Sequence, residues 1–364
     1  MKILVAMSGG IDSSVVAHLL KEQGHDIVGV RFTLWSDPLA PPLAQLLPSK
    51  CCDAQSAMRS RTVAESLDIP FHVVDLKEDF KRIVVDHFLD EYKHGRTPNP
   101  CVVCNRQIKF GKLLELADQY GCDMLATGHY ARVVQEKIAD GTSRFLLLEA
   151  TDKEKDQSYY LHGLTQRQLQ RIQFPLGAMQ KDAVYSLAKR FGIPFDNETY
   201  RESQDLCFFP EKSPHAFLKR HLKETLQPGD IVQRDGNVIG RHEGLPLYTI
   251  GQRRGLHIGG LKIPLEVIAK DTKHNRLIVE EKDRAQSMHC NVTDLTWISW
   301  QPEEDCERTF ECRTRSLSPK RKGIFVFKNG KGTFRYSEPA PLQSPGQYLV
   351  LYSREELIGG GVIE

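Results

Sequence analysis

The sequence predicts an α/β fold in which a parallel sheet flanked by helices forms the first half of the chain and antiparallel β-structure forms the last third. Strand and helix patterns alternate from residue 2 to residue 127, which is typical of a parallel sheet covered by helices. From Leu226 onward, Gly and Pro become frequent, and short alternating apolar runs replace helical periodicity. A chain of 364 residues has room for roughly two or three domains.

The expected strands of the first half span 2–5, 27–34, 71–76 and 123–127. The expected helices span 54–67, 80–92 and 110–120, followed by 165–173 and 179–191. Prolines interrupt the stretch after Trp35, so we expect a surface loop there. Because parallel strands end at one edge of the sheet, residues 6–14, 32–35 and 127–130 should meet in a ligand pocket.

The first turn, Ala6-Met-Ser-Gly-Gly-Ile-Asp-Ser-Ser14, leads from the first strand into a helix. Backbone N–H groups at the start of a helix bind phosphate oxygens well. Ser8 and Ser13 add hydroxyl donors, and Asp12 can orient a metal ion or receive a proton. The spacing is neither Gly-x-x-x-x-Gly-Lys-Ser/Thr nor Gly-x-Gly-x-x-Gly. An ordinary glycine-rich turn is the alternative, but the strand before and the helix after favour phosphate binding.

The last third contains two hairpin patterns, 265–270 with 276–280 and 324–327 with 333–336. The second pair surrounds Asn329-Gly330, which is a strong hairpin signal. We expect an α/β domain over 1–209, a small linking β domain over 210–275, and an antiparallel β-barrel or sandwich over 276–364.

Composition limits the class of protein. The formal net charge is only +2, so a nucleic-acid partner would need a local basic surface. The first residues do not resemble a secretion signal, and no run approaches about eighteen apolar residues. We therefore expect a cytoplasmic protein with no membrane partner. Nine cysteines in such a chain argue against a structural disulfide framework.

Cys101 and Cys104 lie in Thr97-Pro-Asn-Pro-Cys-Val-Val-Cys-Asn105, where prolines suggest an exposed loop. A Cys-x-x-Cys pair fits a redox couple, half of a zinc site or part of an iron–sulfur site. No second Cys-x-x-Cys or His-x₃-His pattern recurs, which argues against zinc, and two buried structural cysteines are a further alternative. Cys207 precedes two phenylalanines, so by itself it fits a core position as well as a functional one.

Taken together, the motifs resemble those of bacterial tRNA-specific 2-thiouridylases, which replace oxygen by sulfur at the 2-position of the wobble uridine. The resemblance covers nearly the whole chain. Its residues are Met7–Ser14, Gly95–Pro100 with Cys104-Asn105, Ile108–Phe110, Thr127–Tyr130, Lys155–Tyr160, Leu206–Phe208, Gly240–Gly255, Pro345–Gln347 and Gly359–Gly361. The first turn is similar to the pyrophosphate-binding loop (PP-loop) of ATP pyrophosphatases, which have a Rossmann-like sheet.

The resemblance implies roles for individual residues. ATP, with Mg²⁺, would contact Ala6, Met7, Ser8, Gly9, Gly10, Ile11, Asp12, Ser13, Phe32 and Gly128. Cys207 would receive sulfur as a persulfide from a sulfur-relay donor protein, and Cys104 would be the partner nucleophile, the two ending in a disulfide. Asn99, Pro100 and Cys101 would face the target base, whereas His129, Lys155, Asp156, Gln157, Arg315, Ser316 and Gln347 would contact the tRNA. Basic residues such as Arg313, Lys320, Arg321 and Lys322 would hold the RNA backbone.

Cys101 and Ser316 depart from the family pattern. The family usually has aspartate at position 101 and commonly an aromatic residue at 316. With Cys101, the chain has a third thiol beside Cys104 and Cys207, and three thiolates with one open position suit a [4Fe–4S] cluster. A cluster-dependent route is therefore an alternative to the persulfide route. A different PP-loop ATP pyrophosphatase and a non-catalytic RNA-binding scaffold are further alternatives, which the joint presence of loop and thiols disfavours.

Overall fold

The computed structural model describes residues 1–41, 54–138, 141–195, 206–259, 263–282 and 284–364. Cys51 and Cys52, with most of the loop expected after Trp35, lie outside these ranges. The first domain is built on a parallel sheet with strand order β3-β2-β1-β4-β7. Its strands are β1 (Lys2–Ala6), β2 (Asp26–Thr33), β3 (Phe71–Asp75), β4 (Met124–Ala126) and β7 (Ile172–Gln173). The expected parallel sheet is therefore confirmed.

Helices cover both faces of this sheet because its central strand is apolar on both sides. Ile3 and Val5 pack with Val15 of α1 on one face, whereas Leu4 packs with Phe110 on the other. The helices are α1 (Ile11–Glu22), α3 (Ala54–Ser66), α4 (Lys77–Phe80), η1 (Lys81–Val85), α5 (Asp86–Lys93), α6 (Pro100–Val103), η2 (Cys104–Lys112), α7 (Leu113–Gln119), η3 (Ser158–Leu161), α8 (Gln166–Leu169) and α9 (Lys181–Arg190).

Two expectations about these helices were wrong. Cys101 and Cys104 do not lie in a loop: Pro100 occupies the first position of α6, and helical backbone continues from there through η2 and α7. A proline is compatible with the first helical position because an N–H group there would have no acceptor within the helix. The helix expected over 165–173 ends at Leu169, and Ile172–Gln173 forms β7.

The second unit follows α10 (His215–His221) and η4 (Lys223–Thr225). Its sheet has the order β10-β11-β8-β9. The elements are β8 (Gly229–Gln233), β9 (Val238–His242), η5 (Leu245–Leu247), β10 (Leu265–Asp271) and β11 (Arg276–Glu281). The expected hairpin of β10 and β11 is present, and β11, which begins after the boundary expected at 275, also pairs with β8.

The third unit is a closed antiparallel barrel, because β12 pairs with both β15 and β17. Its strands are β12 (Gln286–Trp297), β13 (Cys306–Arg313), β14 (Arg321–Lys328), β15 (Lys331–Pro341), β16 (Tyr348–Ser353) and β17 (Glu356–Ile363). Asn329 and Gly330, at φ of 51° and 73°, make the expected two-residue turn between β14 and β15.

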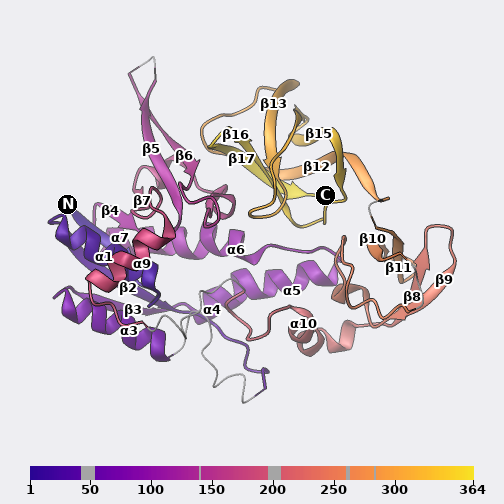
Figure 1. Cartoon of the computed structure of the whole chain (residues 1–364), viewed down its shortest axis with the longest axis horizontal. Coiled ribbons are helices and arrows are strands. Elements are labelled where there is room, and N and C mark those ends of the chain that lie inside the picture. The colour runs from indigo at the N-terminus through magenta and orange to yellow at the C-terminus, as the bar shows by residue number, and fades with distance from the viewer. Residues whose placement is uncertain (42–53, 139–140, 196–205, 260–262, 283) are drawn as a thin grey trace.

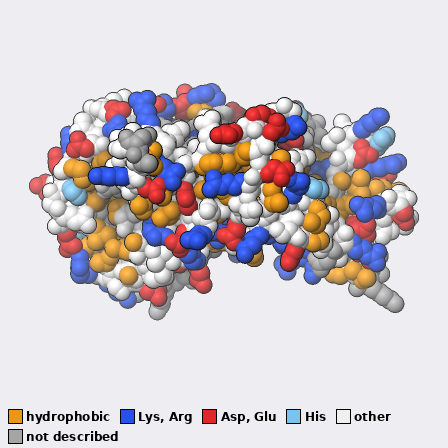
Figure 2. Space-filling model, turned by 90° about the horizontal axis from the view of Figure 1, so that it is seen from above, with side chains coloured by type: hydrophobic (Ala, Val, Ile, Leu, Met, Phe, Trp, Pro, Cys, Tyr) orange, Lys and Arg blue, Asp and Glu red, His pale blue; other side chains and the backbone are white. Residues whose placement is uncertain are grey.

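The barrel lies above α5 and α6 of the first domain (Figure 1). A hairpin of the first domain, β5 (Ala131–Lys137) and β6 (Ser143–Glu149), joins the edge of β17. Glu149, at the end of β6, forms ion pairs with Arg313 at 3.0 Å and with Lys320 at 3.1 Å. On the face seen from above, basic and acidic side chains are interspersed rather than gathered into one positive patch (Figure 2). Among the described residues, no helix is long and apolar enough to cross a bilayer.

Candidate active site

The turn after β1 lies at the carboxyl edge of the sheet, between the ends of β2 and β4. Ser13 closes it: its hydroxyl accepts from the Ser8 N–H at 3.2 Å and donates to the Gly10 carbonyl at 3.1 Å. The carbonyls of the turn face guanidinium groups, since Arg31 donates to Ser8 O at 2.6 Å and Arg59 to Gly9 O at 2.8 Å. Because the two guanidinium groups offset the negative partial charge of these carbonyl oxygens, the start of α1 is a favourable place for a phosphate group.

Gly9 and Gly128 allow close backbone approaches around this turn. Gly9 has φ +82°, and a Cβ there would lie 2.0 Å from the carbonyl oxygen of Ser56 in α3. A Cβ on Gly128, just after β4, would lie 3.0 Å from both Asp12 Cβ and Ser13 N. Residues 12–13 and 128 therefore meet, as expected for the ends of β1 and β4, and Phe32 is half-buried near the end of β2.

Asp12 is held by groups from two other segments. Its Oδ1 accepts from the Tyr130 hydroxyl at 2.9 Å and from Lys181 Nζ at 2.7 Å. Lys181 begins α9 and its side chain is almost fully buried. A positive charge is thus fixed beside the turn after β1.

Cys101, Cys104 and Cys207 line one cavity of about 490 Å³. Other residues of its wall include Pro100, Asn105, Lys109, His129, Lys155, Asp156, Gln157, Tyr160, Ser316 and Leu317. Most residues expected to contact the target base or tRNA are therefore in one place. The segment 127–130 connects the turn after β1 with the cavity, because Gly128 touches that turn and His129 lines the cavity.

The segment before α6, around Thr97, contacts both the second unit and the barrel. Thr97 N donates to Pro345 O at 2.7 Å, its hydroxyl lies 3.3 Å from that of Thr249, and Gln347 Nε2 donates to Thr97 O at 2.7 Å. Gln347 thus contacts the chain before α6 rather than lining the thiol cavity. Asn99 is the N-cap residue of α6, and it too does not line the cavity.

Cys207 is positioned by an aromatic cluster. Its neighbour Phe208 is buried against Phe88 and Phe217, with ring centroids 5.3 and 5.4 Å away. The Phe208 carbonyl accepts from Asp37 N at 3.0 Å, and the buried Asp37 carboxylate binds His221 of α10 at 2.8 Å. The position before Phe208 is thereby fixed at the cavity wall.

His129 lies between aromatic rings, with its Nδ1 2.7 Å from the Thr127 hydroxyl. Burial, with a smaller contribution from the Lys109 charge, holds its pKa well below 6.5. His129 is therefore neutral near pH 7 and acts there as a hydrogen-bonding group rather than as a cation.

Asp156 and Gln157 hold backbone as well as lining the cavity. Asp156 is buried, accepts from Ala150 N at 2.9 Å and binds Arg313 at 3.1 Å; burial raises its pKa. Gln157 Oε1 accepts from Tyr130 N at 3.0 Å. Arg313 and Asp156 thus form an ion pair with each other. Ser316 shares a hydrogen bond with Tyr160 at the cavity wall.

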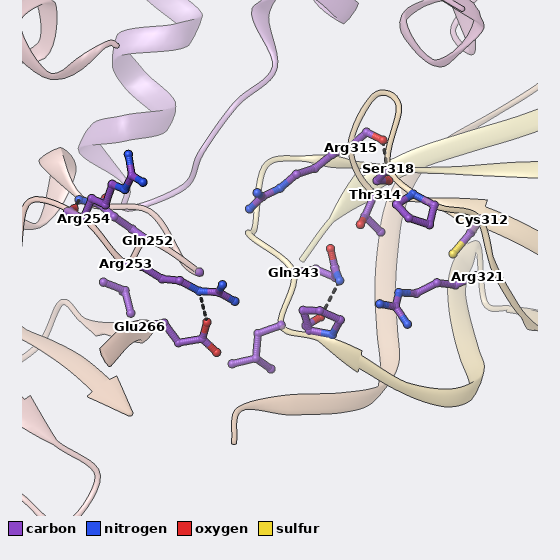
Figure 3. Close-up of a pocket in the computed structure, with 15 residues that line it drawn as sticks. Gln252, Arg253, Arg254, Glu266, Cys312, Thr314, Arg315, Ser318, Arg321 and Gln343 are labelled. Atoms are coloured by element: carbon purple, nitrogen blue, oxygen red, sulfur yellow. Dashed lines mark hydrogen bonds and ion pairs between the residues drawn. The ribbon is translucent and has the colours of Figure 1, made fainter. Parts of the chain in front are cut away.

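Arg315 belongs to a second cavity, of about 620 Å³, between the second unit and the barrel. Arg315 and Arg321 from the barrel side and Arg253 and Arg254 from the facing loop surround it (Figure 3). Arg253 binds Glu266 at 3.0 Å. This concentration of guanidinium groups is suited to phosphate oxygens.

The other described cysteines lie elsewhere. Burial raises the pKa of Cys290 to about 12 and that of Cys122 and Cys312 above its ordinary value. Such thiols are poor nucleophiles. Cys306 lies at the start of β13.

Arg31, Arg59 and Lys181 are site residues that the sequence did not reveal. Arg31 had a signal, since it interrupts an apolar strand and a buried arginine needs specific partners. Arg59 and Lys181 stand in ordinary helical patterns and become recognisable only through their contacts with the turn.

Comparison with known proteins agrees with this architecture. Residues 1–211 match the family model "tRNA methyl transferase HUP domain", 215–281 the "tRNA methyl transferase PRC-barrel domain", and 287–363 the "Aminomethyltransferase beta-barrel domain". The chain is 42% identical over 364 residues to a protein of Geobacter metallireducens named tRNA-specific 2-thiouridylase MnmA, covering 100% of this chain and 96% of that one. Proteins with the same name from Symbiobacterium thermophilum and Chloroflexus aggregans are 39% and 42% identical, over 100% and 99% of this chain and 92% and 98% of theirs.

Proposed function

The chain belongs to the tRNA-specific 2-thiouridylase family, and from this premise we propose that it converts the wobble uridine of tRNA to 2-thiouridine with ATP, releasing AMP and pyrophosphate. One observation carries the proposal: the cavity lined by Cys104 and Cys207 is joined to the phosphate-binding turn through residues 127–130. An ATP-activated base and the sulfur that attacks it would thus occupy neighbouring sites.

In the first step the uracil O2 attacks the α-phosphorus of ATP. The new O–P bond forms as the bond to the bridging oxygen breaks, so pyrophosphate leaves with that electron pair, and the N3 proton passes to solvent water. The 2-carbonyl is a poor electrophile, and the attached AMP makes its oxygen a good leaving group. Lys181 and the start of α1 would offset charge on the departing pyrophosphate.

Magnesium would enter with ATP, on the phosphate oxygens. Asp12 Oδ1 is already bound by Tyr130 and Lys181. Within the described ranges, no group of His, Cys, Asp and Glu side chains converges as a metal site would require. When bound, the ion would neutralise phosphate charge.

In the second step the outer sulfur of a Cys207 persulfide attacks C2 and AMP departs. The Cys104 thiolate then attacks the inner sulfur, which breaks the S–S bond, leaves sulfur on C2 and forms a Cys104–Cys207 disulfide. Reduction of this disulfide and new sulfur from a donor protein would prepare the next turnover. Cys104 is buried and Cys207 is half-buried in this structure.

A [4Fe–4S] cluster fits this cavity poorly. Cys101, Cys104 and Cys207 line the same wall, but across the described part of the chain they do not form a metal-ligand group. We therefore assign no step to a cluster, and Cys101 remains a thiol facing the target base.

The tRNA would place its wobble base in the thiol cavity after the base leaves the anticodon stack. The arginines around the second cavity would bind backbone phosphates. Purified protein, unmodified tRNA, ATP and a persulfide donor test the proposal: AMP and pyrophosphate should form only with tRNA, and digested tRNA should contain 2-thiouridine. Thiolation by the Cys207→Ser variant would overturn it.

A further inference from the structure

Asn105 carries a buried hydrogen-bond acceptor that the fold leaves unused. The residue follows Cys104 on η2, is only 4% exposed and lines the thiol cavity. Its Nδ2 donates to the Tyr160 carbonyl at 3.3 Å. Its Oδ1 is buried, and no donor from the described residues reaches it.

The orientation of this amide is set by its partner. A backbone carbonyl only accepts hydrogen bonds, so the NH₂ group must face Tyr160 O and the oxygen must lie on the other side. The Tyr160 side chain also shares a hydrogen bond with Ser316. Burying an unsatisfied acceptor costs free energy, and in native proteins such a group calls for a specific explanation.

We propose that Asn105 Oδ1 accepts a hydrogen bond from N3–H of the target uracil and is a specificity-determining residue of the thiolation site. The proposal rests on the proposed function and names how its substrate is recognised. Uracil carries a proton on N3, whereas cytosine has a lone pair there, so cytosine would place two acceptors against each other. A site with a buried polar group rejects an analogue that leaves this group unpaired.

The same contact would position the reacting carbon. N3 is bonded to C2, and Asn105 follows the proposed nucleophile Cys104 in the chain. A base held through N3–H therefore has C2 one bond away from the contacting atom, inside the cavity that Cys104 and Cys207 also line. Asn105 would discriminate between bases and orient the correct one through a single hydrogen bond.

A double-mutant cycle on binding tests this without requiring turnover. An anticodon stem–loop with uridine at the target position is compared with one carrying 3-deazauridine, which replaces N3–H by a carbon. Binding to the full chain is measured with a non-hydrolysable ATP analogue. For the wild type we expect binding to weaken by about tenfold, as for loss of one buried hydrogen bond. For Asn105→Ala the two RNAs should bind within about twofold of each other.

Two variants separate recognition from a structural role. Asn105→Asp retains an acceptor and should retain discrimination between the two RNAs, whereas a purely structural role predicts that it behaves like Asn105→Ala. Gln107→Ala removes an exposed amide from the same helix and should discriminate as the wild type does. ATP-analogue binding without RNA should be equal in all variants, which reports an intact first domain.

The outcomes are distinguishable. Equal discrimination by the wild type and Asn105→Ala would overturn the role of Asn105 while leaving the proposed function intact. If the wild type did not bind the uridine stem–loop at all, the proposed function and this inference would both be wrong.

Discussion

Replacing Gly9 by alanine tests whether the turn after β1 positions ATP. Gly9 has φ +82°, and its added Cβ would lie 2.0 Å from Ser56 O. Real Cβ atoms essentially never come closer than 3.0 Å to such an atom, so the turn and α3 must separate by about 1.0 Å (3.0 − 2.0). Arg31 bridges these segments through Ser8 O and Ser56 Oγ, so the separation also strains its hydrogen bonds.

A displacement of about 1 Å in a group that positions substrate costs roughly 100-fold in rate, or about 2.7 kcal/mol of transition-state stabilisation. We therefore expect Gly9→Ala to lower kcat/KM for ATP by about 100-fold, measured as tRNA-dependent pyrophosphate release. The left-handed backbone itself adds about 1 kcal/mol to the cost of alanine.

Gly24→Ala is the matched control. Gly24 has φ +78° and no atom within 4 Å of the added Cβ, so it carries the backbone strain without the contact. Its kcat/KM should stay within about twofold of the wild type. The reasoning is refuted if Gly9→Ala, with the same folded fraction, turns over ATP as fast as Gly24→Ala.

Three further predictions concern the thiols, pH and the core. Cys104→Ser and Cys207→Ser should each abolish 2-thiouridine formation while still binding ATP and tRNA, and a thiolating variant of either would contradict the sulfur route. Burial lowers the pKa of His162 from 6.5 to about 4, so the native state excludes a proton that the unfolded state binds. Its neutral ring therefore contributes about 3 kcal/mol of stability above pH 6.5, which is lost as the pH falls to about 4. The His162→Asn variant retains a donor for Tyr159 O, so its unfolding free energy, measured in urea, should not show this loss. The same pH dependence in the variant as in the wild type would contradict the assignment. Phe208→Ala should cost about 3–5 kcal/mol of unfolding free energy and reduce thiolation more than ATP binding; equal losses in both would argue against its anchoring of Cys207.

The fold class was predictable because its signals are local and repeated. The apolar run before Ala6 and the Asn329-Gly330 pair each specify their own structure. The helix carrying Cys101 and Cys104 was missed, since Pro100 fits both a loop and the first turn of a helix.

The site was predictable where motifs are continuous in sequence. The turn and the cysteines were identified in this way. Lys181 and Arg59 were missed because their positions depend on how α9 and α3 pack against the turn, which no local pattern encodes. The orphaned oxygen of Asn105 is likewise a property of packing around Tyr160.

A single-turnover experiment tests the central claim, that the phosphate-binding turn and the thiol cavity act on one base, most directly. Protein carrying a persulfide on Cys207 is mixed with ATP and unmodified tRNA, without reductant, and the products are quantified by mass spectrometry. The account predicts AMP, 2-thiouridine and a Cys104–Cys207 disulfide in equal amounts. AMP without 2-thiouridine, or 2-thiouridine without that disulfide, would contradict it.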